Sequence, residues 1–131
     1  MISIDETREM LEELAAELPE PFFRELNGGI SLLPEAKLSP IARAEDLYIM
    51  GEYCRSRALG RYIVIYYGSF MKLYGHLDRE RLLPKLRETL RHEFRHHLES
   101  LAGEKGLELE DERQAREYLE ARPRQGVYRR K

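Results

Sequence analysis

DRERLLPKLRETLRHEFRHHLESLA, residues 78–102, is the longest segment of the chain with helical periodicity. Its large apolar side chains recur at intervals of three and four residues, so they fall within one arc of a helical wheel. These apolar positions are Leu83, Leu86, Leu90, Phe94, Leu98 and Leu101. Asp78 is the expected N-cap, and Gly103 stands where a C-terminal glycine ends many helices. The segment therefore predicts one long amphipathic helix, with the rest of the chain packed around it.

The same segment contains His92-Glu93-Phe94-Arg95-His96, an HExxH motif. Residues four apart share a helix face, so the two imidazoles can converge on one tetrahedral zinc ion. Glu93 lies about 100° further round the helix, where it can reach a water on that metal and act as general base. The two histidines lie opposite the apolar arc, so we expect the metal face to point away from the core. The alternative is a charged helix face that carries two solvated histidines by chance.

A catalytic zinc site needs a third protein ligand and one open coordination position. Glu99 shares the histidine face, but it lies too far along the helix axis, so we expect it beside the ligands or at the surface. His97 falls on the flank of the apolar arc and is expected in the core or behind the ligands. The segment after Gly103 can fold back to the histidines. It offers the acids Glu110, Asp111, Glu112 and Glu117.

The remaining elements predict an α+β fold. Segments rich in β-branched and aromatic residues indicate strands, at Ile30–Leu33, Leu47–Tyr53 and Arg61–Tyr67. The short Cys54–Gly60 loop favours antiparallel pairing of the last two strands. Further helices are expected at Asp5–Leu18, with Asp5 or Thr7 as its cap, at Ser69–Tyr74 and at Glu110–Glu120. We therefore expect a small, mostly antiparallel or mixed sheet on the long helix, with helices from both ends of the chain beside it.

Length and charge fit a single domain, residues 1–120, followed by a basic tail, residues 121–131. The net charge of the 131-residue chain is −2, and the tail holds five basic residues and no acid, so the other residues carry −7. An acidic body argues against nucleic acid as a partner. The single Cys54 excludes an intramolecular disulfide and fits a cytoplasmic protein. We also expect no membrane span and no secretory signal, because no apolar run is long enough.

Three motifs in order resemble the small bacterial zincin-like metallopeptidases, also called minimal metalloproteases. They are a strand with Gly51-Glu52-Tyr53, an apolar strand ending in Tyr66-Tyr67-Gly68, and a helix with the His-Glu-x-x-His-His of residues 92–97. The resemblance implies a compact zincin-like fold and zinc-dependent hydrolysis of peptides or proteins. It also implies one Zn²⁺ per chain, with His92 and His96 as ligands and Glu93 as the base.

The chain departs from the family pattern after the second histidine. The family's glycine and aspartate positions hold Glu99 and Ala102 here. The acidic segment that follows in the family is similar to residues 110–113, which makes Asp111 the third ligand, with Glu112 or Glu117 as alternatives.

A peptide substrate is expected to pair with the strand Arg61–Tyr67 as a sheet edge, through Ile63, Ile65 and Tyr67. The competing hypothesis is a non-catalytic metal-binding or protein-interaction module on the same scaffold.

Overall fold

The computed structural model describes residues 1–41, 47–105 and 117–119 and has the mixed helix and strand content of an α+β protein. The elements in chain order are α1 (Ile4–Ala16), the 3₁₀-helix η1 (Glu20–Phe23), β1 (Gly29–Leu33), β2 (Lys37–Leu38), β3 (Tyr48–Ile49), β4 (Gly51–Ser56), β5 (Gly60–Tyr66), α2 (Tyr67–Tyr74) and α3 (Arg79–Lys105). Residues 117–119 are also helical. The expected α+β class is therefore confirmed.

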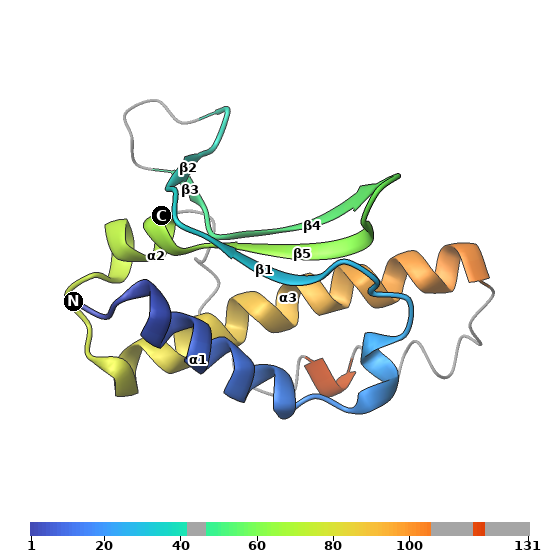
Figure 1. The fold of residues 1–131 in the computed structure, drawn as a ribbon, viewed down its shortest axis with the longest axis horizontal. Helices are drawn as coiled ribbons and strands as arrows, with labels where there is room; N and C mark the ends of the chain where they lie inside the picture. The colour runs from blue at the N-terminus through green and yellow to red at the C-terminus, as the bar shows by residue number, and fades with distance from the viewer. Residues whose placement is uncertain (42–46, 106–116, 120–131) are drawn as a thin grey trace.

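The main sheet has the strand order β1-β5-β4, with β1 parallel and β4 antiparallel to β5 (Figure 1). The predicted mixed sheet and the β4–β5 hairpin are thus confirmed. The predicted strand Leu47–Tyr53 is divided at Met50, because β3 pairs with β2 in a separate two-stranded sheet. Met50 lies between β3 and β4 in sequence and is fully buried.

The prediction that Arg61–Tyr67 forms a sheet edge is wrong. β5 is the central strand, and Ile63 and Ile65 are fully buried on its inner face. Tyr67 is the first residue of α2, and its hydroxyl donates to the carbonyl of Ile2. A strand rich in apolar residues suits a position with neighbours on both sides, and the two edges of the described sheet are β1 and the more polar β4.

The helix α3 lies beneath one face of the main sheet, and α1 packs against α3 (Figure 1). The shared core is formed by side chains that are at most 2% exposed, including Met10, Leu14, Ile63, Ile65, Leu82, Leu86, Leu90 and Phe94. The apolar arc predicted for the long helix is therefore the side that enters this core. Within the described residues, no helix is both long and apolar enough to cross a membrane.

The start of α1 differs from the predicted one. Ser3 is the N-cap: its Oγ accepts from the Glu6 backbone N–H at 3.1 Å, and the Glu6 carboxylate accepts from the Ser3 N–H at 3.1 Å. This reciprocal capping box satisfies two backbone donors at once, which neither Asp5 nor Thr7 would do. Thr7 is instead buried, and its hydroxyl donates to the Ser3 carbonyl at 2.9 Å.

The helix α3 begins as predicted and ends later. The Asp78 carboxylate accepts from the Arg81 backbone N–H at 3.0 Å, which is the expected N-cap bond. Gly103 does not end the helix, which continues to Lys105. A helical glycine costs only ~1 kcal/mol, too little to stop a helix that is held by its neighbours. Of the predicted helix Glu110–Glu120, only residues 117–119 are described; the basic tail also lies outside the described residues.

Candidate active site

The two histidines of the HExxH motif converge on one point. Their Nε2 atoms are 3.0 Å apart, and the rings meet edge to face with centroids 4.6 Å apart. Two nitrogen ligands of a tetrahedral zinc ion, each bonded at ~2.0–2.1 Å, lie ~3.3 Å apart. His92 is buried at 6% exposed, whereas the His96 side chain is 46% exposed. The pair therefore fits half of a zinc ligand set, with one ligand anchored and the other at the surface.

Glu93 lies beside the histidines in a groove of about 1000 Å³ between β4 and α3. The carboxylate-bearing residue is only 3% exposed. Burial of an ionised carboxylate costs free energy unless nearby groups form hydrogen bonds or ion pairs with it. A buried acid therefore often belongs to a functional site. The groove is lined by Ile49, Gly51, Glu52, Tyr53, Cys54, His92, Glu93, Arg95, His96, Glu99 and Ser100.

The expectation that the metal face points away from the core needs correction. His92 and Glu93 are turned from the α1 side of α3, but β4 covers them, so they are buried rather than solvated. Gly51 permits this coverage. A Cβ at Gly51 would lie 3.1 Å from Thr89 Cγ2 and 3.1 Å from Ile65 Cδ1. The glycine of the Gly51-Glu52-Tyr53 motif thus allows the strand to pass close over the helix.

His97 fixes the distance between β4 and α3. Its Nε2–H donates to the Arg24 carbonyl at 2.9 Å, so its Nδ1 is the acceptor for the Tyr53 hydroxyl at 2.8 Å. The residue is fully buried, and burial lowers the pKa of its imidazole, which keeps it neutral. The prediction of a core or supporting histidine is confirmed: it joins η1's end, the edge strand and the motif helix.

The backbone of β4 has one unpaired side among the described strands. The Met50 carbonyl accepts from the Tyr66 N–H at 2.9 Å, which makes alternate residues of β4 face β5. By the same alternation, the N–H and C=O groups of Gly51, Tyr53 and Arg55 point away from β5. Of these residues, Gly51 and Tyr53 line the groove together with His92 and Glu93.

Glu52 is a groove residue that the sequence analysis did not single out. Its carboxylate accepts from the Tyr66 hydroxyl at 2.7 Å and from the Lys37 ammonium at 2.9 and 3.0 Å. Burial, together with the neighbouring Glu52, raises the pKa of Tyr66 to about 12. The alternation of residues along a strand could have predicted that Glu52 lies on the sheet face opposite α3. It could not have predicted the partners from β2 and β5, because the tertiary fold brings them together.

The structure describes some of the candidates for the third zinc ligand and not others. Asp111 and Glu112 lie outside the described residues. Glu117 is described, but the adjacent Tyr118 donates its hydroxyl to the Glu17 carbonyl at 3.0 Å, on the α1 side of α3. Glu99 approaches His96 Nδ1 at 3.6 Å, as a neighbour of the ligand. Within residues 1–41, 47–105 and 117–119, no cluster of three His, Cys, Asp or Glu side chains could hold a metal ion.

These features define a class: a small α+β protein with an HExxH helix beneath the edge strand β4 of a short mixed sheet. No family model matches the chain, and no curated protein matches it. A solved structure does, that of a conserved hypothetical protein (TTHA0227) from T. thermophilus, with a TM-score of 0.64 and 40% sequence identity. The match covers 77% of this chain and 98% of the other. The chain therefore belongs to the same family as that protein, whose description states no activity.

Proposed function

We propose that this protein is a zinc-dependent metallopeptidase with a zincin-like fold, in which Glu93 is the general base. One observation carries the proposal: the Nε2 atoms of His92 and His96 are 3.0 Å apart in a groove that also contains Glu93. The sequence spacing alone would allow two unrelated surface histidines. Their convergence beside a buried carboxylate is the arrangement that a zinc hydrolase requires. The resemblance to minimal metalloproteases supports the same activity.

The proposal gives each side chain a separate role. His92 and His96 would hold the ion, with Asp111 as the proposed third ligand. Bound zinc would polarise the scissile carbonyl and lower the pKa of a coordinated water to about 7. Glu93 would accept a proton from the attacking water and return it to the amine that leaves. Its place in the groove beside the two histidines suits this role.

The substrate would lie along β4 rather than along β5. An extended peptide can pair with the outward-facing backbone groups of Gly51 and Tyr53 and so add a strand to the sheet. This position places its backbone over Glu93, since both residues line the same groove. Main-chain pairing fixes the peptide without reading its side chains, so it sets the position of the scissile bond and not the specificity.

The test combines metal content with cleavage of a peptide library. Protein purified without chelators should contain about one zinc per chain, and His96→Ala should lose most of it. Glu93→Gln should retain the zinc and lose cleavage by at least about a hundredfold, because general-base catalysis typically contributes that much. Glu80→Gln is the matched control, since Glu80 lies on the same helix in its first turn and away from the groove.

Three outcomes would contradict the proposal. If Glu93→Gln cleaves as fast as the wild type, the base is elsewhere. If zinc binds but no library peptide is cleaved, the non-catalytic metal-binding or protein-interaction module becomes the better account. If the chain takes up no zinc, the metal has no role in either the peptidase or the non-catalytic module.

A further inference from the structure

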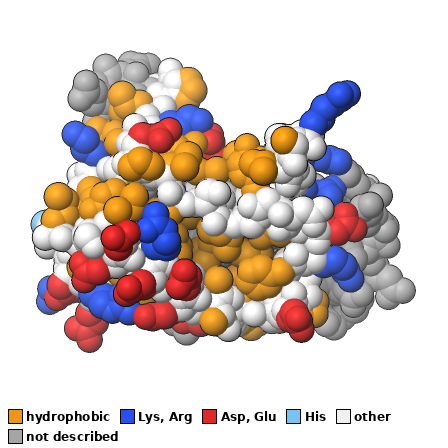
Figure 2. Space-filling model, viewed as in Figure 1, with side chains coloured by type: hydrophobic (Ala, Val, Ile, Leu, Met, Phe, Trp, Pro, Cys, Tyr) orange, Lys and Arg blue, Asp and Glu red, His pale blue; other side chains and the backbone are white. Residues whose placement is uncertain are grey.

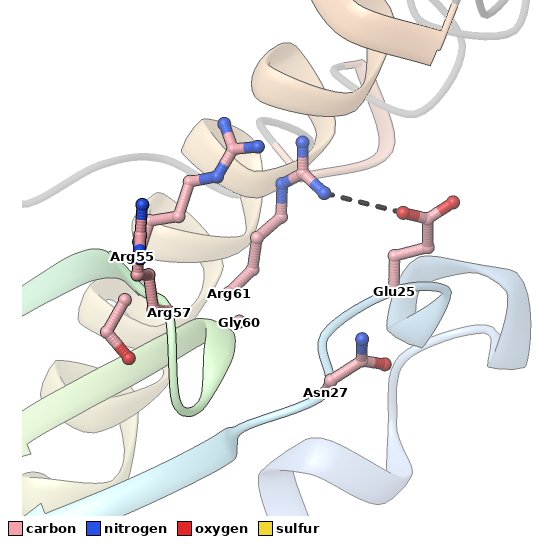
Figure 3. Close-up of a pocket in the computed structure, with 7 residues that line it drawn as sticks. Glu25, Asn27, Arg55, Arg57, Gly60 and Arg61 are labelled. Carbon is pink, nitrogen blue, oxygen red and sulfur yellow. Dashed lines mark hydrogen bonds and ion pairs between the residues drawn. The ribbon is translucent and has the colours of Figure 1, made fainter.

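The main sheet has a second edge strand, β1, on the side away from the groove. β1 pairs in parallel with β5, and no other strand of the described chain pairs with it. It begins beside the β4–β5 hairpin, where the Gly28 N–H donates to the Arg61 carbonyl at 2.9 Å. Figure 3 shows this junction, with Asn27 beside Gly60 of the hairpin. The other side of β1 is therefore a sheet edge that a further strand can extend.

The outward-facing backbone groups of this edge belong to Ile30 and Leu32. The Tyr66 N–H bonds to the β4 side, so the odd-numbered residues of β5, such as Ile63, bond to β1. Ile63 lies opposite Ile30, and in a parallel ladder it bonds to the residues before and after that partner. The N–H and C=O groups of Ile30 and Leu32 therefore point away from β5. Among the described residues, no backbone hydrogen bond outside the sheet involves either of them.

The residues of β1 carry none of the usual protection of an exposed edge. Natural edge strands avoid pairing with other chains by means of charged side chains, an internal proline or a bulge. The sequence of β1, GISLL, has no charge and no proline, and all five residues are partly exposed. Figure 2 shows hydrophobic side chains in the middle of this face, where Figure 1 places β1. A strand of this kind readily pairs with a strand of another chain.

The strand β1 is complementary to a second copy of itself in antiparallel pairing. The register in which the two strands overlap completely places Ser31 opposite Ser31 and Ile30 opposite Leu32. Ile30 and Leu32 would then exchange their outward-facing N–H and C=O groups across the interface, twice by symmetry. Their side chains pack against the core on the α3 side of the sheet, and they would form apolar cross-strand pairs there. The two serine side chains would meet on the other face.

The two ends of β1 differ in charge in a way that favours antiparallel pairing. The hairpin at its start carries the exposed Arg57. At its other end the Tyr67 hydroxyl donates to the Ile2 carbonyl, so α1 begins nearby, with Asp5 and Glu6 exposed in its first turn. Figure 2 shows Asp and Glu side chains gathered over α1, and Lys and Arg side chains near the hairpin. Antiparallel pairing would bring the acidic end of one copy to the basic end of the other.

We propose that two copies of this chain associate through β1 into a dimer with one continuous sheet. The strand order across the dimer is β4-β5-β1-β1-β5-β4. A two-fold axis passes between the two Ser31 residues, so both copies use the same surface. The two grooves lie at the outer edges of this sheet, where pairing through β1 leaves β4 free for a peptide. The dimer therefore goes beyond the proposed peptidase function and does not depend on it.

The first experiment measures the mass of the full chain by analytical ultracentrifugation. From low micromolar to submillimolar concentration, the 15.5 kDa chain should convert to a species of about twice that mass. Ser31→Glu and Ser31→Lys should each raise the dissociation constant at least about tenfold, because each new charge faces its own copy. An equimolar mixture of the two variants should restore the dimer, since opposite charges then meet. Ser31→Thr is the matched control and should dimerise like the wild type, because its hydroxyl and β-branch suit a cross-strand pair.

A cross-linking experiment tests the register. Directly opposite residues of this kind have Cα atoms ~4.5 Å apart, a separation that a disulfide can bridge. Cys54, the single cysteine of the chain, is first replaced by serine. In that background Ser31→Cys should give a disulfide-linked dimer under mild oxidation, as seen on a non-reducing gel. Leu33→Cys is the control and should stay unlinked, because the two copies of position 33 would lie about 13 Å apart along the paired strands.

A chain that stays monomeric up to submillimolar concentration would overturn the proposal. A dimer that persists unchanged in both Ser31→Glu and Ser31→Lys would show that another surface forms the interface. Equal cross-linking through positions 31 and 33 would contradict the antiparallel register. Circular dichroism checks that each variant is folded. None of these measurements involves zinc or a peptide, so the dimer and the peptidase can each fail while the other holds.

Discussion

Two sides of α3 contain buried side chains, and the two sets are chemically opposite. On the side toward α1, Leu86, Leu90 and Phe94 are at most 1% exposed. On the side toward β4, His92 and Glu93 are 6% and 3% exposed, and Thr89 is fully buried. One helix therefore has an apolar core side, here defined by Leu86, Leu90 and Phe94, and a polar groove side, defined by Thr89, His92 and Glu93.

This difference shows which side of α3 stabilises the fold and which side depends on the fold for its position. Burial of an apolar side chain contributes roughly 1.5–3 kcal/mol, whereas burial of a polar group costs free energy unless it is satisfied. The Thr89 hydroxyl makes no hydrogen bond in the described part of the chain. Burial of the Thr89 hydroxyl thus costs stability, and such a loss is usual where a site needs poorly hydrated groups. Variants of the two sides should separate stability from chemistry.

The largest expected effect comes from the core side. Phe94→Ala should lower the free energy of unfolding by about 3–5 kcal/mol, since it leaves a cavity at a fully buried position. Phe94 also packs edge to face against Phe23, with centroids 5.0 Å apart, and this contact would be lost. Denaturant unfolding, followed by circular dichroism, gives the change.

The matched variant from the groove side is Glu93→Gln, one residue away and similarly buried. It keeps the shape of the side chain and most of its capacity for hydrogen bonds, so the loss of stability should be smaller than that of Phe94→Ala, on the order of 1 kcal/mol. A loss as large as that of Phe94→Ala would show that the groove side also carries the fold. The comparison between the two sides would then be wrong.

Local patterns predicted the core side well. The apolar periodicity of residues 78–102 identified α3 because a helix that faces a core must repeat its apolar residues every three or four positions. The Asp78 cap and the β4–β5 hairpin were predicted for similar reasons, since both depend on residues close in sequence. The capping of α1 was missed because the signal lay two residues earlier, where Ser3 and Glu6 form the capping box.

For the groove side, the sequence predicted the shared face of the two histidines but not the strand that covers it. The HExxH spacing places His92 and His96 on one face, but it cannot say what covers that face. The cover is β4, and its approach depends on Gly51 against Thr89 and on the bond between Tyr53 and His97. These contacts join residues about forty apart in sequence, as the hydrogen bond between positions 53 and 97 shows. The edge strand was misassigned for the same reason, because strand order is set by tertiary pairing and not by local composition.

An intermediate loss of stability is expected for the hydrogen bond that joins α3 to β4. Tyr53→Phe removes the hydroxyl that donates to His97 Nδ1 and leaves that buried nitrogen without its donor, which should cost about 1–3 kcal/mol. The zinc content should stay near that of the wild type, because Tyr53 holds the strand and not the ion. Cleavage should fall if the strand shifts.

Tyr62→Phe is the control for Tyr53→Phe, because Tyr62 lies on β5 opposite Cys54, does not line the groove and is partly exposed. It should change stability by less than about 0.5 kcal/mol, the usual range for surface positions. If Tyr53→Phe is as mild as this control, the Tyr53–His97 bond does not fix the distance between β4 and α3.

The smallest expected effect lies at the rim of the core side, where α1 meets α3. The Glu17 carboxylate accepts from Arg87 at 2.8 and 2.9 Å and from Arg91 at 3.4 Å, and these bonds hold the pKa of Glu17 below its usual range. A carboxyl group with a depressed folded-state pKa stabilises the fold above its unfolded pKa, and the contribution is lost as the pH falls through the folded pKa.

Glu17→Gln should therefore cost up to about 1 kcal/mol near neutral pH, since the side chain is partly exposed, and almost nothing in acid. Urea unfolding at a series of pH values measures the difference between wild type and variant, with Glu12→Gln, at an exposed position of α1, as the control. A difference that stays constant with pH would show that the amide loses packing rather than charge, and the ion pair would then contribute nothing to the core side.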